Sequence, residues 1–350
     1  MKPGDDFWQY AVGGWLKANP LDAQHPENGA FTDLSELNND RINKLIMAYA
    51  KKKNLPQGSD GQKIGTLYRL YMDSVSRNKM GYEPIMPYLK QVREVQTREE
   101  ALKLMYALDA KGFNTAPFGL SLSLNPFNSS EFMMHAGHGG ASLPKEYYDQ
   151  PNEQQQATVA AILQPPFFDP EADYVSNYGA IGAVIGHEMT HGFDGQGCQF
   201  DKDGNLANWW TADDKARYDE RTKVIADWFS EQEAVPGLKV NGQKTLGENV
   251  SDNGGLKIAY RAFENRMKQE PLGTVDGFIP AQHFYLAYAR VWACNSTPEY
   301  TAMLVNSDVH SPARLRVMAA LPMIDTWYEA FGIKSTDKMF IPKEKRALVW

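Results

Sequence analysis

Cysteine is nearly absent from this chain of 350 residues, which contains only Cys198 and Cys294. Two cysteines allow at most one disulfide, which excludes a framework of several disulfides. The pair neither requires an oxidising compartment nor excludes one. Whether the two thiols pair is left open at this point.

Long apolar runs are missing too. The longest weakly polar run, Tyr178 to Gly186, is far shorter than the roughly 20 residues that span a bilayer. The first thirty residues contain no apolar core of a signal peptide. We therefore expect no integral membrane segment and no signal peptide in this chain.

An excess of basic residues is also missing. Lysine and arginine total 36 against 43 acidic residues, so the formal net charge is −7. No global positive field exists to hold nucleic acid or an anionic membrane, and neither partner is expected. Hydrophobic residues at 43% and charged residues at 23% are ordinary for a globular protein. The oligomeric state cannot be read from these numbers.

One compositional shift divides the chain. Residues 149–158 are polar and rich in glutamine, which is typical of a boundary between parts. A chain of this length has room for two cores of roughly 150 residues each. We therefore expect an amino-terminal helical part, residues 1–155, and a second part, residues 156–350, that packs with it.

Apolar spacing predicts helices on both sides of this boundary. Thr97 lies three residues before Glu100, a capping box that predicts the start of a helix. Between residues 118 and 124 apolar side chains alternate with small ones, which predicts a strand. We therefore expect a mainly α fold with a small β-sheet, of the α+β class. The helical stripes lie at residues 42–49, 64–75, 256–267 and 284–291.

The clearest chemical signal is a His-Glu-x-x-His motif at residues 187–191, on a predicted helix that Gly192 should end. His187 and His191 are four residues apart and project from one helix face. Both imidazoles can therefore reach one zinc ion, each at about 2.0–2.1 Å. Glu188 then lies beside the metal, where it can take a proton from zinc-bound water and pass it to a leaving amine.

The motif alone leaves an alternative open, two helix-surface histidines beside an ordinary glutamate. A catalytic zinc needs a third protein ligand, and Glu248 supplies a candidate. Asp252, four residues later, could accept a hydrogen bond from the other ring nitrogen of a ligand histidine. The alternative for this acidic pair is a solvent-facing helix start, where negative charge complements the helix dipole.

These residues belong to a longer series of ordered motifs. The series includes Gly4-Asp5-Asp6-Phe7, Gly14-Trp15-Leu16, Asn177-Tyr178-Gly179, His187-Glu188-Met189-Thr190-His191-Gly192-Phe193-Asp194, Asn208-Trp209-Trp210, Pro298-Glu299-Tyr300, Asp308-Val309-His310-Ser311-Pro312 and Val349-Trp350. In these motifs and their order the chain resembles the neprilysin family of zinc metallopeptidases, especially its bacterial oligopeptidase members. The resemblance implies a thermolysin-like zinc metallopeptidase catalytic core.

The resemblance implies a function as well, a zinc-dependent metalloendopeptidase that hydrolyses oligopeptides with a Glu-activated, zinc-bound water. It implies one Zn²⁺ per chain, held by His187, His191 and Glu248. Glu188 is then the general base, and Asp252 orients a ligand histidine. Spacing along the chain predicts the same five roles.

Two further roles rest on the resemblance alone. It implies that His310 hydrogen-bonds the developing oxyanion and that Arg316 binds a substrate carbonyl. A donor or cation placed where negative charge develops lowers the barrier. Without the resemblance, the two residues would be interpreted as a lone polar histidine and a surface arginine.

The chain also departs from the family. Members are nearly twice as long and have a second, helical domain that caps the active site. We expect that this domain and a strand that pairs with substrate backbone are missing here, by a deletion near residues 155–161. Because strand pairing supplies backbone hydrogen bonds to a peptide, an alternative function is a zinc-binding but peptidase-silent remnant that acts as a binding or structural protein. Family members act outside the cytoplasm, which implies a periplasmic, cell-envelope or secreted location.

Overall fold

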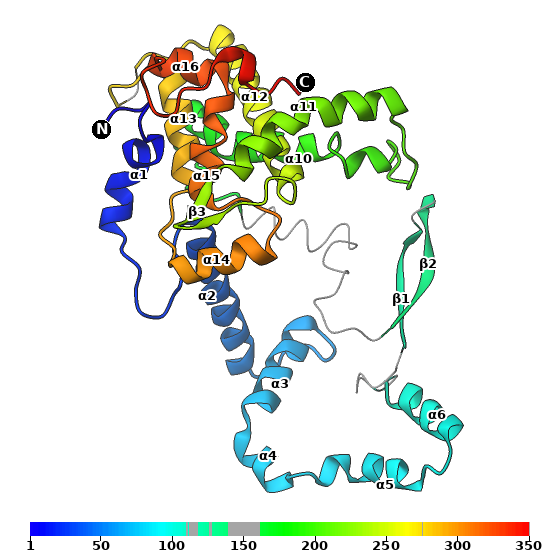
Figure 1. The fold of residues 1–350 in the computed structure, drawn as a ribbon. Helices are drawn as coiled ribbons and strands as arrows, with labels where there is room; N and C mark the ends of the chain where they lie inside the picture. Colours follow the sequence, from blue (N-terminus) through cyan, green and yellow to red (C-terminus); the bar gives the residue numbers. More distant parts are fainter. Residues whose placement is uncertain (110, 112–117, 126–127, 139–161, 275, 350) are drawn as a thin grey trace. The chain divides into compact units, whose positions relative to one another are not determined.

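The computed structural model describes the whole chain except residues 110, 112–117, 126–127, 139–161, 275 and 350 (Figure 1). The chain divides into two units, residues 1–35 with 156–350, and residues 36–155. The expected parts, 1–155 and 156–350, share the boundary after residue 155 but group residues 1–35 with the first part. The polar stretch at residues 149–158 lies entirely outside the described residues.

The unit formed by residues 1–35 and 156–350 is helical in most of its described residues. A short antiparallel hairpin joins β3 (Glu233–Val235) to β4 (Leu238–Lys239). A π-helical turn at residues 178–182 leads into the helix of the His-Glu-x-x-His motif. The helices are α1 (Phe7–Ala18), α9 (Tyr174–Asn177), α10 (Ala183–His191), α11 (Ala212–Ser230), α12 (Leu246–Gln269), α13 (Pro280–Val291), α14 (Pro298–Ser307), α15 (Ala313–Met318) and α16 (Asp325–Phe331).

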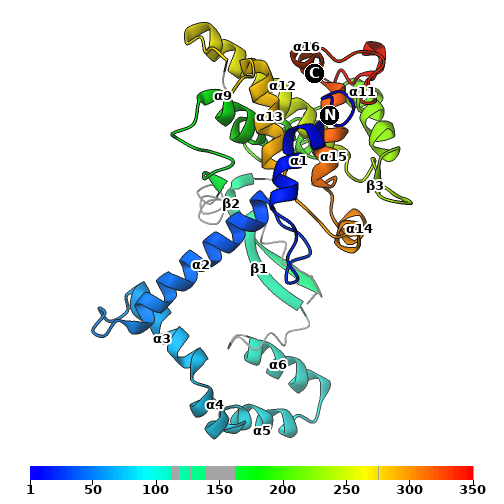
Figure 2. The same ribbon diagram turned by 90° about the vertical axis from the view of Figure 1, so that its left-hand side faces the viewer.

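Aromatic side chains from distant segments form the core of this unit. Phe7 of α1 meets Trp327 of α16 edge-on, with ring centroids 5.7 Å apart. Tyr260 of α12 stacks on Tyr285 of α13, with centroids 5.5 Å apart, and the two helices lie side by side (Figure 1, Figure 2). Such pairs add to the apolar area that they bury. The amino-terminal helix therefore shares one core with the carboxy-terminal half of the chain.

Two glycines let α10 and α12 approach closely. A Cβ atom at Gly255 of α12 would lie 2.4 Å from the backbone nitrogen of His187. A Cβ at Gly186 of α10 would lie 2.6 Å from the carbonyl oxygen of Gly255. Only the hydrogen of glycine fits at these points. The crossing therefore sets the distance between the side chains that project from the two helices.

We expect Gly255→Ala to lower the free energy of unfolding by roughly 2–3 kcal/mol, because the methyl group meets rigid backbone. Zinc affinity should fall with it, since the two helices must separate. Urea unfolding of the metal-free protein and a zinc titration measure both effects. The matched control is Gly14→Ala on α1, where nothing lies within 4 Å of a new Cβ. Equal unfolding midpoints for the two variants would contradict the prediction.

The unit of residues 36–155 confirms the predicted capping box and strand. The Glu100 amide donates to Thr97 Oγ1 at 3.2 Å, and the Thr97 amide donates to Glu100 Oε2 at 3.0 Å. The strand expected near residue 118 is β1, which pairs antiparallel with β2. The elements are α2 (Ala30–Lys51), which begins before this unit, α3 (Asp60–Met72), α4 (Ser74–Met80), α5 (Met86–Glu94), α6 (Arg98–Asp109), β1 (Phe118–Asn125) and β2 (Asn128–His138).

The apolar stripes of this unit form as helices but stay exposed. The stripe expected from Ile64 to Val75 is broken, because Asp73 accepts a hydrogen bond from the Ser76 amide at 2.9 Å and so begins α4. Among the described residues of this unit only Gly65 and Leu108 are buried. Periodicity therefore predicted helices here, but not what covers them.

Neither a membrane helix nor a disulfide occurs in the described residues. None of the described helices combines the length and the apolar character needed to cross a bilayer. Cys198 is buried and Cys294 half-buried, and each carries a free thiol.

Candidate active site

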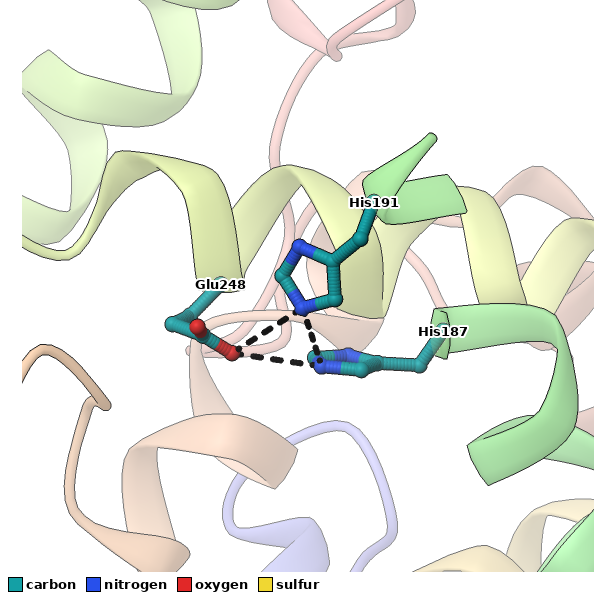
Figure 3. A group of neighbouring side chains, drawn as sticks. All are labelled: His187, His191 and Glu248. Atoms are coloured by element: carbon teal, nitrogen blue, oxygen red, sulfur yellow. Dashed lines mark hydrogen bonds and ion pairs between the residues drawn. The ribbon is translucent and has the colours of Figure 1, made fainter. Parts of the chain in front are cut away.

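The two motif histidines share one face of α10, as their spacing predicts. A carboxylate holds the Nδ1 atom of each imidazole. Nδ1 of His187 lies 2.9 Å from Asp252 Oδ1, and Nδ1 of His191 lies 2.8 Å from Asp194 Oδ2. Because the carboxylates accept the Nδ1 protons, both Nε2 atoms are left to bind a metal. Figure 3 shows both rings turned toward Glu248.

Glu248, in the first turn of α12, completes a set of three ligand atoms. Its Oε2 lies 3.2 Å from Nε2 of His187 and 3.5 Å from Nε2 of His191. The two Nε2 atoms are 3.0 Å apart. Ligands about 2.0–2.1 Å from a tetrahedral zinc lie about 3.3–3.4 Å from one another. The three separations fit that geometry, and we call His187, His191 and Glu248 the candidate zinc site.

The charges at the candidate zinc site also fit a cation. Oε2 of Glu248 is buried and makes no hydrogen bond of good geometry. The imidazoles of His187, His191 and His310 nevertheless lie within 3.5 Å of it. Contacts with Asp194 and Glu248 raise the pKa of His191 to about 10, despite its burial. Burial lowers the pKa of His187, but Asp252 and Glu248 outweigh it, so this pKa is raised too. The carboxylates thus favour positive charge at this point, which a divalent ion supplies.

We expect zinc binding to release at least one proton at neutral pH, because His191, whose pKa is raised to about 10, must lose its Nε2 proton. The raised pKa of His187 acts in the same direction. Zinc affinity should therefore increase with pH through the neutral range, by up to tenfold per proton and pH unit. Calorimetric titration in two buffers of different ionisation enthalpy measures the release. A binding enthalpy that is the same in both buffers would contradict the prediction.

Asp252 is buried on α12 and also pairs with Arg316 of α15. Arg316 Nε donates to Asp252 Oδ2 at 2.8 Å, and Nη2 donates to Oδ1 at 2.6 Å. Burial raises the pKa of Asp252, but Arg316 and His187 lower it overall, so the carboxylate stays charged. The guanidinium also lies over the ring of Trp292, 3.9 Å from its centroid. Arg316 is therefore buried and not the surface arginine that its sequence context suggests.

Asp194 contacts both the ring of His191 and nearby backbone. Its Oδ2 accepts the Nδ1 proton of His191, while its Oδ1 accepts hydrogen bonds from the amides of Gln196 and Gly197 at 2.7 and 2.8 Å. Ser251 Oγ lies 3.0 Å from the same Nδ1. Sequence reasoning missed Ser251. Its position next to Asp252, on a helix that carries a ligand, was the only available signal.

The remaining predicted site residues meet at one cavity. The cavity has a volume of about 170 Å³, and its wall contains Glu188 and His310. Nε2 of His310 lies 3.0 Å from Glu248 Oε2, and its Nδ1 lies 2.7 Å from Asp308 Oδ1. Glu188 is exposed on α10. The rest of the wall consists of Phe31, Ile162, Ala183, Val184, His187, Asp252, Tyr288, Trp292 and Arg316.

Comparisons with known proteins identify relatives of this chain. Human neprilysin is 37% identical over 216 residues, which cover 60% of this chain and 28% of neprilysin. A neutral endopeptidase of Lactococcus lactis subsp. lactis (strain IL1403) is 35% identical over 213 residues, or 61% of this chain and 32% of the relative. The matches thus span about three tenths of the length of these curated relatives.

A solved structure supports the fold. It is the Mycobacterium tuberculosis zinc metalloprotease Zmp1 in complex with an inhibitor, which superposes with a TM-score of 0.83 at 18% identity and covers 100% of this chain and 98% of that chain. Two family models described as peptidase family M13 match residues 3–165 and 146–347. The chain belongs to peptidase family M13.

Proposed function

We propose that this chain is a zinc-dependent metalloendopeptidase that hydrolyses peptide bonds in oligopeptides. The observation that carries the proposal is the convergence of two imidazole nitrogens and one carboxylate oxygen, 3.0–3.5 Å apart, beside a cavity whose wall contains His187 and Glu188. The names of the relatives, neprilysin and neutral endopeptidase, support the same class of reaction.

His187, His191 and Glu248 would hold the zinc ion in this proposal. When bound, zinc supplies Lewis-acid polarisation of the scissile carbonyl and lowers the pKa of a water molecule. Glu188 takes a proton from the attacking water at its carboxylate and delivers it to the leaving amine. Its exposed position on the cavity wall, outside the three ligand atoms, suits a group that moves protons and does not bind the metal.

Asp252, His310 and Arg316 would position and stabilise the reacting groups. Asp252 keeps Nδ1 of its histidine protonated, so that Nε2 faces the metal. His310 Nε2 lies 3.0 Å from Oε2 of Glu248, one of the atoms that would hold zinc. From this position its N–H would donate a hydrogen bond to the substrate oxyanion. Arg316 uses Nε and Nη2 for Asp252, and its Nη1 has no hydrogen bond to a described residue, which leaves it for a substrate carbonyl.

Three broader features of the chain are also proposals. Peptides are the proposed partners, and a location outside the cytoplasm follows the resemblance to the family. The division at residue 155, with loss of the family's capping domain, remains a prediction.

A cleft without that cap would admit longer polypeptides, so short peptides and an unfolded protein chain should be cleaved at similar relative rates.

The test is cleavage of a mixed peptide library by zinc-loaded protein, read by mass spectrometry. Two controls run beside it, the Glu188→Gln variant and the protein with a chelator. Cleavage that disappears in both controls supports the proposal. No cleavage with one zinc bound per chain would favour a peptidase-silent, zinc-binding protein, and the predicted loss of the substrate strand would then be the leading explanation.

A further inference from the structure

A second, larger hollow adjoins the active-site cavity. This groove has a volume of about 650 Å³ and shares Phe31, Trp292, His310 and Arg316 with the cavity wall. All of its lining residues belong to the unit of residues 1–35 and 156–350. A peptide whose scissile bond lies at the candidate zinc site can therefore extend into the groove.

All but one of the charged side chains along the groove have an ionic partner. Glu27 is the exception, since it forms no ion pair with any described residue. The lining pairs are Arg314 with Asp6 at 3.2 Å, Arg316 with Asp252 at 2.6 Å, and His310 with Asp308 at 2.7 Å. Glu27 is thus the carboxylate of the groove wall that has no basic partner among the described residues.

Backbone hydrogen bonds hold the segment around Glu27 in place. The Asn28 amide donates to the carbonyl of Asn295 at 3.0 Å, and the Thr297 amide donates to the carbonyl of Pro26 at 2.8 Å. Between them, Glu27 forms a bridge to Ser296, whose hydroxyl also contacts the carboxylate. The carboxylate is therefore attached to a fixed edge of the groove.

The surroundings of Glu27 make its charge costly without a partner. The side chain is half-buried, and burial raises the pKa of Glu27 despite the contact with Ser296. A cation that binds there regains part of this desolvation cost. Apolar side chains of the same groove, Leu16 and Leu304, suit the methylene stem of a lysine or arginine.

We infer that Glu27 determines specificity for a cationic group, an ammonium or a guanidinium, in the part of the peptide that occupies the groove. The inference rests on the proposed function, since it deepens the substrate preference of the same site. The cation has two possible sources, an internal lysine or arginine side chain and a free amino terminus.

The first experiment maps cleavage sites in the peptide library. We expect lysine or arginine at one fixed distance from the scissile bond, with kcat/KM about tenfold higher than for glutamine at that position. Glu27→Gln should remove this preference, and Glu27→Lys should reverse it toward acidic residues. Glu299→Gln, an exposed carboxylate on α14 outside the groove, should leave the preference unchanged. A second library of amino-acetylated peptides separates the two sources, because only an internal side chain keeps its charge.

A second experiment does not need catalysis. Fluorescence anisotropy measures binding of amino-acetylated peptides that differ only in lysine or glutamine to the zinc-loaded Glu188→Gln protein, with and without Glu27→Gln. Tighter binding of the lysine peptide that depends on Glu27 and weakens in salt supports the inference even if no peptide is cleaved. Equal binding of both peptides, or a lysine preference that survives Glu27→Gln, overturns it even if the protein is an active peptidase.

Discussion

Glu188→Gln is expected to lower kcat/KM for peptide cleavage by about 10²–10⁴-fold, the usual contribution of a general base. The amide has nearly the shape of the carboxylate but cannot take a proton from water. Zinc affinity should stay close to that of the parent protein, because Glu188 is not one of the three convergent ligands. Initial rates on one cleaved peptide, with zinc content measured on the same samples, test both statements.

The matched control for this variant is Glu264→Gln, which removes a carboxylate on α12 that pairs with Arg261 away from the cavity. It should leave both the rate and the zinc content unchanged. Full activity of Glu188→Gln at full zinc occupancy would contradict the assigned role. Loss of zinc from Glu188→Gln would instead mean that this residue helps to hold the metal.

Asp252→Asn is expected to be the most damaging single change at the site. It leaves the buried Arg316 without a countercharge, which should lower the free energy of unfolding by about 3–5 kcal/mol. It also takes the anionic partner from Nδ1 of His187, which should weaken zinc binding by about 10–100-fold. Chemical unfolding of the metal-free protein and competition with a chelator measure the two effects separately.

The double variant Asp252→Asn/Arg316→Met separates stability from metal binding. Removing both charges should restore most of the lost stability, because no unpaired charge remains buried. Zinc affinity should stay low, because His187 still lacks its carboxylate. Arg316→Met alone serves as the comparison. A double variant as unstable as Asp252→Asn would show that the ion pair is not the cause.

The local parts of the site could be predicted from the sequence. The i, i+4 spacing of His187 and His191 determines that both lie on one helix face. The same rule applied to Glu248 and Asp252, because α12 does begin there. The capping box at Thr97 and Glu100 could be predicted equally well, because all of its hydrogen bonds form within four consecutive residues.

The non-local parts could not be predicted in this way. Resemblance to a family suggested roles for His310 and Arg316, but no pattern indicated that Arg316 is buried against an aspartate 64 residues away. Glu27 was not singled out, because only the structure shows that the other charged residues of the groove already have partners and that Glu27 does not. The exposed stripes of residues 36–109 make the same point, since spacing predicts a helix and not its neighbours.

The sequence by itself determined the chemistry available to this protein, two imidazoles and a carboxylate beside a free glutamate, because local helix geometry orders residues four apart. Tertiary structure alone decided that these groups meet. The glycine contact between Gly186 and Gly255 sets the approach of α10 and α12, and the buried pair of Asp252 and Arg316 joins α12 to α15. Both depend on packing between segments that are distant in sequence. There the free energy of folding is determined by burial and backbone contact, and not by residue spacing.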